Sequence, residues 1–171
     1  ITLDGAINPL AADLVVSNGS KTIDLNGKTL TLANGVDGDQ ITITSNDCTI
    51  TNGTITLQKA SSIDGAGTGA LIKGVTFTGA FGLTNATTAG RVYENVVFAD
   101  AVTATKALTL KGTVTTGNVA DAFVPTETIT LANSAVVTLG GNTTTVGTNG
   151  LTVASGTSAT VDDVVVTATS A

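Results

Sequence analysis

The amino-acid sequence predicts an all-β solenoid, in which short strands stack along one axis and the chain bends within each repeat. In the segments TIDLNGKTLTL and TNGTITL, which lie between Thr22 and Leu57, apolar residues alternate with polar ones. This two-residue period is typical of half-buried strands. An Asn-Gly pair interrupts the alternation in both segments, and Asn and Gly tolerate the positive φ that a bend in a strand requires.

The same strand–corner–strand unit recurs along the chain. Its corner residues, spaced by 13 to 26 positions, are Gly27, Gly53, Gly74, Asn95, Gly112, Ser134, Gly150 and Asp163. Units of variable length around a constant strand pattern are typical of solenoids. We expect parallel strands with the first five corner residues in one column. We also expect one interior column, formed by Ile55, Phe77, Phe98 and Val114.

The segment TIDLNGKTLTL also carries a resemblance to known folds. The sequence resembles right-handed parallel β-helices of the pectin-lyase-like type over about residues 22–167, and this segment looks like their opening rung. The resemblance implies a single-stranded right-handed parallel β-helix with irregular rung lengths and little or no helix. The motif is short and degenerate, so it implies a fold and no activity.

Composition favours one domain with a narrow core. The 171 residues are 42% hydrophobic but only 3% aromatic, and the chain contains 20 Gly and no Trp, Met or His. A chain of this length is one domain by default. A chain rich in β-branched residues favours strands. Because it has few aromatic rings, its core is expected to consist of stacked aliphatic side chains.

The elements are expected in the following order. Residues 1–20 form an N-terminal cap or edge, with a strand at 1–5, a single helical turn over 10–14 and a strand at 14–17. Asn8 would cap that turn, with Pro9 at its first position. Wider rungs follow over 21–116 and narrower rungs over 127–171.

Loops are expected where polar residues, Gly or Pro interrupt the strands. They are predicted at 34–40, 60–69, 81–90 and 117–126. The last loop contains Pro125, which has no N–H to donate to a central ladder and therefore requires a loop or an edge strand.

Charge argues against nucleic-acid binding, hydropathy argues against a membrane span, and the low content of charged residues favours export. The formal net charge is −6, the sequence pI is about 4.2 and the seven cations are scattered singly, which argues against nucleic-acid binding. No apolar run approaches the length of a membrane span. Charged residues are only 12% of a chain that begins at Ile1, so we expect an extracellular protein whose leader peptide is removed.

The single cysteine, Cys48, is interpreted as a small buried hydrophobe, with an intermolecular disulfide or a reactive thiol as alternatives.

Candidate catalytic and metal-binding residues are few. Sugar-cleaving chemistry needs a pair of carboxylates, and the available ones are Asp24, Asp37, Asp39, Asp47 and Asp64. With one Arg and no His, we expect no enzyme, although a polysaccharide-active enzyme is kept as an alternative. Asp37 and Asp39 could hold calcium, but their segment matches no calcium motif, so we expect a solvated turn and no cofactor.

Threonine triplets raise the possibility of an ice-binding surface. The pairs are Thr29/Thr31, Thr42/Thr44, Thr49/Thr51, Thr54/Thr56, Thr76/Thr78, Thr113/Thr115 and Thr128/Thr130. Counted from the expected corners, Thr follows Gly27 and Gly74 by two and four positions, but follows Gly53 and Gly112 by one and three. This mismatch predicts an irregular lattice. Outward Thr is also what any strand surface favours.

The ends of a solenoid remain as the expected functional surface. Each end is a row of unpaired backbone groups that must be covered or used. Apolar strands lie near both termini, and the predicted interface residues are Ile1, Thr2, Leu3, Val164, Val165 and Val166. We expect a structural subunit whose copies associate head to tail into an extracellular filament. A cell-surface adhesin or an ice-binding module is the alternative.

Overall fold

The computed structural model describes residues 1–10, 14–32, 41–57, 63–64, 67–79, 81–83, 92–100, 102–104, 108–116, 123–125, 129–139, 143–146, 151–153, 160–162 and 165–168. These residues form strands, turns and bends, and no helix occurs among them. The pairings between described strands are parallel, including that of β6 (Thr49–Thr56) with β8 (Leu71–Thr78). The all-β prediction and the parallel pairing of the central strands are therefore confirmed.

One large sheet runs along the whole molecule. Besides β6 and β8, it contains β1 (Ile7–Leu10), β3 (Thr22–Asp24), β4 (Thr29–Leu32), β10 (Val92–Glu94), β11 (Val97–Phe98), β13 (Leu108–Thr116), β15 (Ile129–Leu139), β17 (Leu151–Val153) and β18 (Thr160–Asp162). The long strand β6 pairs with both β3 and β4, so two short strands occupy the positions that one long strand fills in the next repeat.

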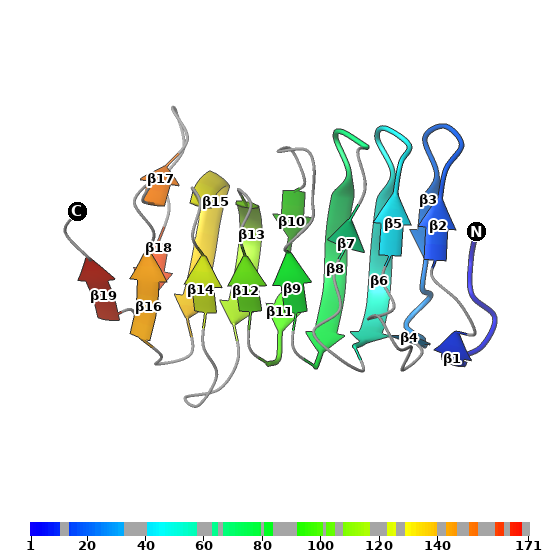
Figure 1. Ribbon diagram of the computed structural model, residues 1–171, viewed down its shortest axis with the longest axis horizontal. Coiled ribbons are helices and arrows are strands. Elements are labelled where there is room, and N and C mark those ends of the chain that lie inside the picture. Colours follow the sequence, from blue (N-terminus) through cyan, green and yellow to red (C-terminus); the bar gives the residue numbers. More distant parts are fainter. Residues whose placement is uncertain are drawn as a thin grey trace.

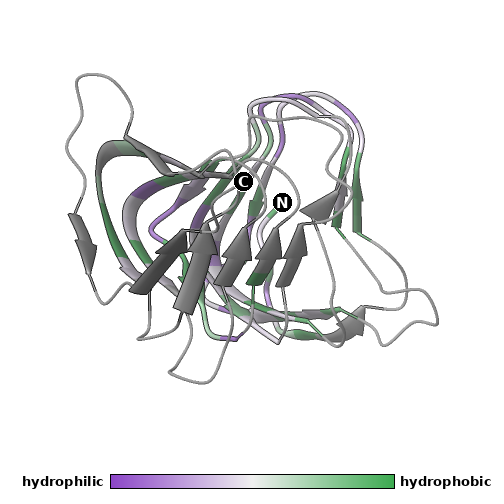
Figure 2. Cartoon of the chain, turned by 60° about the vertical axis from the view of Figure 1, so that its left-hand side comes forward, coloured by the Kyte–Doolittle hydropathy of each residue, from purple (hydrophilic) through white to green (hydrophobic). Residues whose placement is uncertain are grey.

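The remaining strands form a second row. They are β2 (Leu14–Val16), β5 (Ile41–Ile43), β7 (Ile63–Asp64), β9 (Phe81–Leu83), β12 (Val102–Ala104), β14 (Phe123–Pro125), β16 (Thr143–Val146) and β19 (Val165–Ala168). They pair in the orders β2-β5-β7, β9-β12-β14 and β16-β19. Figure 1 shows them side by side, with the two termini at opposite ends of the long axis. Figure 2 shows in a turned view that the large sheet is curved.

Each passage of the chain adds two segments to the large sheet and one to the second row. We call such a passage a repeat. The first contains residues 1–3, β1 and β2, and the second contains β3, β4 and β5. The next five contain β6 and β7, then β8 and β9, then β10 to β12, then β13 and β14, then β15 and β16. The last contains β17, β18 and β19.

A column of residues with positive φ marks the corners in the large sheet. The φ values are 52° at Asn26, 63° at Asn52, 60° at Gly74, 53° at Asn95 and 64° at Gly112. The neighbouring pairs Lys73↔Glu94 and Glu94↔Lys111 place the last three in register. The predicted column is confirmed at Gly74, Asn95 and Gly112. In the β6 repeat the corner is Asn52 and not Gly53, and in the repeat before it the predicted Gly27, with a φ of 70°, shares the corner with Asn26.

Gly53 is required for another reason. A Cβ at this position would lie 2.5 Å from Leu25 Cβ and 2.6 Å from the Lys28 carbonyl oxygen. Gly53 therefore permits a close approach between repeats, whereas Asn52 makes the bend. An Asn-Gly pair alone does not show which of its two residues adopts the positive φ, and this ambiguity explains the error of one position.

The core consists of side-chain columns that follow the strand register. One buried column contains Ile23, Ile50, Ile72, Tyr93, Leu110 and Leu131. A second contains Leu30, Ile55, Phe77 and Phe98, with the two phenylalanine rings stacked at 5.4 Å between centroids.

The prediction for Val114 was wrong by one column. Phe98 pairs with Thr116, and Val114 pairs with Val137. The Val114 side chain therefore lies in a third buried column, with Val75, Val96 and Val137. The β13 strand carries one residue more than β10 and β11 between the positions that pair with Glu94 and Val97, so distance from the corner does not fix the register there.

The predictions of a helical turn and of three loops were also wrong. The helical turn at 10–14 is contradicted at both ends, because Leu10 ends strand β1 and Leu14 begins β2. Strand β1 lies at the edge of the large sheet, where Pro9 can sit without donating to a ladder. The predicted loops at 60–69, 81–90 and 117–126 contain the strands β7, β9 and β14, and the loop at 34–40 lies outside the described residues. Pro125 does occupy an edge strand, β14, as expected.

Candidate assembly surface at the N-terminal end

Residues 1–3 add one segment to the large sheet. Thr2 pairs in parallel with Asp24. The Asp24 N–H donates to the Ile1 carbonyl oxygen at 2.8 Å, and the Leu3 N–H donates to the Asp24 carbonyl oxygen at 3.0 Å. The terminal amine donates to the Thr22 carbonyl oxygen at 2.8 Å. One edge of the predicted interface segment is therefore already paired within its own chain.

An Asn–Asp network fixes this segment beside the first corner. The Asn26 Nδ2 donates to the Leu3 carbonyl oxygen at 3.1 Å, and the Asn26 backbone N–H donates to Asp24 Oδ1 at 2.8 Å. The Asn52 Nδ2 also donates to Asp24 Oδ1, at 3.2 Å. Asp24, a candidate catalytic carboxylate in the sequence, is thus a hydrogen-bond acceptor that joins two corners.

The end of the stack exposes apolar side chains. Pairing of Thr2 with Asp24 puts Ile1 next to Ile23, the first buried member of an interior column. Ile1 is 79% exposed, and Val15 on β2 is 57% exposed. Leu3, Ile7 and Leu14 are only partly buried against the core. Among the described residues, no further strand covers this end.

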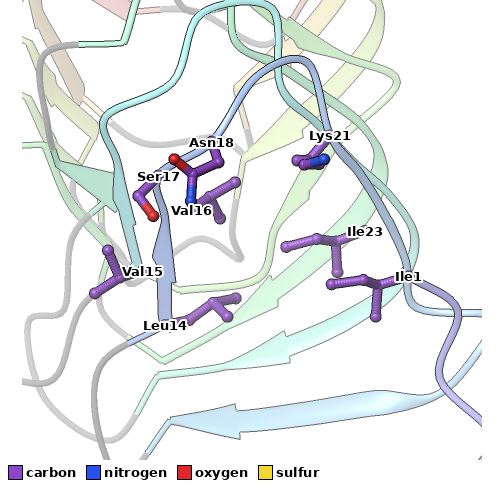
Figure 3. Close-up of a pocket in the computed structure, with 8 residues that line it drawn as sticks. All are labelled: Ile1, Leu14, Val15, Val16, Ser17, Asn18, Lys21 and Ile23. Carbon is purple, nitrogen blue, oxygen red and sulfur yellow. The ribbon is translucent and has the colours of Figure 1, made fainter.

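Two hollows open into the core at this end. The larger, of about 200 Å³, is lined by Ile1, Leu14, Val15, Val16, Ser17, Asn18, Lys21 and Ile23. Figure 3 shows Ile1, Leu14 and Ile23 around this space, with Lys21 near its rim. The smaller, of about 130 Å³, is lined by apolar residues alone: Ile1, Leu3, Ile7, Leu14, Ile23, Leu25 and Leu30. The first repeat therefore offers an apolar face bordered by backbone edges.

The two predicted halves of the interface lie far apart. Val165 and Val166 belong to β19 and pair with Thr143 and Thr144 of β16. Val164 lies outside the described residues. Figure 1 places β19 and the N-terminus at opposite ends of the molecule, so these segments could meet only between two copies. Sequence reasoning missed Leu14, Val15 and Val16 at the N-terminal end, although their apolar run directly precedes the first regular repeat.

The other candidate residues are dispersed. Asp37 and Asp39 lie outside the described residues, Asp47 occupies a turn with φ 55°, and Asp64 pairs with Thr42. Within the described part of the chain, no group of three or more His, Cys, Asp or Glu could hold a metal ion. Cys48 is free and 1% exposed, and its thiol approaches the Gly19 carbonyl oxygen at 3.6 Å. Its interpretation as a small buried residue is confirmed.

The structure also joins charges that looked isolated in the sequence. Glu94 lies between Lys73 and Lys111 of the adjacent repeats, with Nζ–carboxylate distances of 2.9 and 2.7 Å. The hydrogen bond from Lys111 is the main cause that holds the pKa of Glu94 below its ordinary value, and the hydrogen bond from Lys73 is the second. The sequence signal was a charged residue directly before the corner in three successive repeats. The description of the cations as scattered was wrong for this pair.

Neither a membrane-spanning helix in the described part of the chain nor a related protein indicates the function of the chain. The described residues include no helix long and apolar enough to cross a membrane. Comparison of the chain with models of protein families, with curated proteins and with solved structures finds no match.

Proposed function

We propose that the chain is a subunit of an extracellular fibre that grows by end-to-end association of its copies. The observation that carries this proposal is the open apolar face of the first repeat, where Ile1 is 79% exposed and two hollows reach the core. An apolar surface beside unpaired strand edges is a template for pairing with another chain. Head-to-tail contacts of this kind do not close into a ring, and they produce filaments.

The fibre proposal includes a specific form of the fold. Parallel pairing from repeat to repeat, corners in one column and a second row of strands support a single-stranded right-handed parallel β-helix. In such a solenoid each repeat contacts only its neighbours. A further copy would then extend the stack as another repeat does. The low content of charged residues, 12%, favours a surface or secreted location.

The experiment compares two substitutions that add the same charge at different places. Ile1→Glu places a carboxylate on the end face, and Val136→Glu places one on the side of β15, where Val136 is 42% exposed. Both sites are exposed, so both variants should fold, which circular dichroism would check. Sedimentation velocity and negative-stain microscopy should show concentration-dependent fibres for the native chain and Val136→Glu, and monomers for Ile1→Glu. A native chain that stays monomeric at high concentration would refute the fibre.

One observation favours a second candidate, binding to an ordered water lattice such as ice. The register aligns Thr29, Thr54 and Thr76 in one column of the large sheet. A neighbouring column contains the buried Thr31 and the partly buried Thr56 and Thr78, and the Thr78 hydroxyl donates to Thr56 Oγ1 at 3.0 Å. The mismatch inferred from the sequence is wrong for these repeats, because the second corner is Asn52.

This Thr surface is interrupted one repeat later. Val97 pairs with both Thr76 and Thr115 and is 38% exposed. If the surface orders water, Val97→Thr should increase thermal hysteresis and Thr54→Leu should abolish it. Absence of ice shaping by the native chain and by Val97→Thr would remove this candidate and leave the fibre untouched.

A further inference from the structure

The first and last repeats contain the same three segments. The first repeat consists of residues 1–3, β1 and β2, and the last consists of β17, β18 and β19. Strand β17 continues the half of the large sheet that residues 1–3 begin, and β18 continues the half that β1 begins. In each repeat the second-row strand comes last. The two end faces therefore offer strands in the same order.

The register of the stack specifies which residues would meet at a junction. Ile1 is the first position of the column that runs through Ile23 and Leu131, and Val153 is the last described position of that column. Pairing of Ile7 with Leu30 places Ala6 beside Thr29. The column of Thr29 continues through Thr138 to Asp162.

We propose that, in the fibre, the last repeat of one copy stacks in register on the first repeat of the next. This inference rests on the proposed function. Strands β17, β18 and β19 pair in parallel with residues 1–3, β1 and β2 of the neighbour. Val153 then lies opposite Ile1, and Asp162 lies opposite Ala6. We assign the exposed face to a second copy because it continues the columns of this chain. The exposed, apolar Ile1 lies next to Ile23 in an interior column, so the matching column of another copy can extend it.

Paired cysteines test the register directly. Adjacent parallel strands lie about 4.8 Å apart, and a disulfide needs Cα atoms within roughly 7 Å. The double variant Ala6→Cys with Asp162→Cys should therefore cross-link between copies. In the matched control, Ala6→Cys with Thr160→Cys, the second cysteine lies two residues along β18 on the same face, which puts the Cα atoms about 8 Å apart. Both sets retain the buried native Cys48.

Under mild oxidation, we expect a ladder of covalent oligomers from the first pair and about tenfold less from the control. Equal or stronger cross-linking of the control in a preparation that contains fibres would overturn the register and leave the fibre proposal intact. Monomeric native protein, with neither pair cross-linked, would overturn both. Strand β1, which directly follows Ala6, and strand β18, which contains Asp162, lie at opposite ends of the large sheet, so a cross-link cannot form within one chain.

A charge pair provides the second measurement, which needs no cysteine. Ala6 is exposed, so its substitution should leave the fold intact. Opposite Asp162 of a neighbour, Ala6→Asp should raise the critical concentration for fibre growth several-fold, and Ala6→Lys should lower it. Low salt makes the difference largest. The same critical concentration for the two variants would refute the pairing of Ala6 with Asp162.

Discussion

At the scale of single residues, the corners depend on two separate properties of glycine. Gly74 and Gly112 have nearly the same φ, 60° and 64°. A Cβ at Gly74 would meet only the Asn52 nitrogen, at 4.0 Å, whereas a Cβ at Gly112 would clash with Asn95 Oδ1. Asn95 Oδ1 accepts from the Thr113 N–H at 2.9 Å, so its side chain is held where the Cβ would go.

This difference predicts unequal costs for the same substitution. Gly74→Ala should lower the free energy of unfolding by about 1–2 kcal/mol, the ordinary cost of a left-handed conformation for an L-residue. Gly112→Ala should cost clearly more, because it adds a clash and displaces the Asn95 hydrogen bond. Urea denaturation measures both. In an Asn95→Gly background the excess cost at Gly112 should disappear, and an unchanged excess would contradict the clash.

Sequence could predict the corner column but not the role of each residue in it. Asn and Gly at regular returns indicated bends, and four of the five expected positions adopt positive φ. In the pair Asn52-Gly53 both residues can bend a strand, and only the approach of Leu25 to Gly53 decides between them. Likewise, Lys73 and Lys111 become partners of Glu94 only when the register is known.

The ion pairs of Glu94 predict a pH-dependent stability. The pKa of Glu94 is lower in the folded chain than its ordinary value, so the unfolded chain binds more protons between the two values. The stabilisation is therefore present above the ordinary pKa and is lost as the pH falls through the lowered pKa. Glu94→Gln should cost about 1 kcal/mol near neutral pH, since the lysine partners are partly exposed.

Urea midpoints of the native chain and Glu94→Gln, measured at neutral and acidic pH, check this prediction. Their difference should shrink as Glu94 becomes protonated. Lys111→Gln is the matched control, because it removes one of the two partners and should reduce the effect without abolishing it. A difference that is independent of pH would show that the Glu94 carboxylate contributes no stability through its charge.

At the scale of the strands, packing columns determine the energetics. Phe77 and Phe98 are fully buried and stacked, with an interplanar angle of 11°. The ring centroids of Tyr93 and Phe98 lie 5.7 Å apart, so three aromatic rings from two repeats pack together. The alternation of residues predicted this column through Phe98. It could not predict where Val114 would lie, because the additional residue in β13 shifts the register, and a change in strand length leaves no mark on the two-residue alternation.

Substitutions at adjacent positions of β11 should separate packing from surface effects. Phe98→Ala should destabilise the fold by about 3–5 kcal/mol, the usual cost of removing a buried ring. Val97→Thr, one residue earlier, places a threonine between Thr76 and Thr115 and should change stability by less than about 0.5 kcal/mol. Thermal or urea unfolding measures both. Similar costs for the two variants would contradict the assignment of Phe98 to the interior.

At the scale of the whole molecule, sequence indicated apolar ends but not their geometry. Residues 1–3 were expected in a cap or edge strand, and the register shows which edge is used, because they pair with β3 on one side. The openness of the N-terminal face depends on Leu14 and Val15 of the second row, which pattern reasoning assigned to a cap. Each repeat has two segments in the large sheet and one in the second row, and this arrangement brings Leu14 and Val15 close to Ile1. A local sequence pattern cannot predict a contact between residues of different segments.

The acidic charge of the chain predicts that fibre growth depends on salt. Each copy carries a formal charge of −6, so stacking copies along one axis accumulates repulsion. The Debye length falls from about 30 Å at 0.01 M salt to about 10 Å at 0.1 M, which screens charges on neighbouring copies from each other. Sodium chloride should therefore lower the critical concentration for fibres by roughly threefold or more over that range. Light scattering with microscopy would measure it. Ile1→Glu should stay monomeric throughout, because salt screens repulsion between copies and does not restore the apolar contact at their junction. Fibres of the native chain that dissolve as salt is added would instead identify charge attraction as the force that joins the ends.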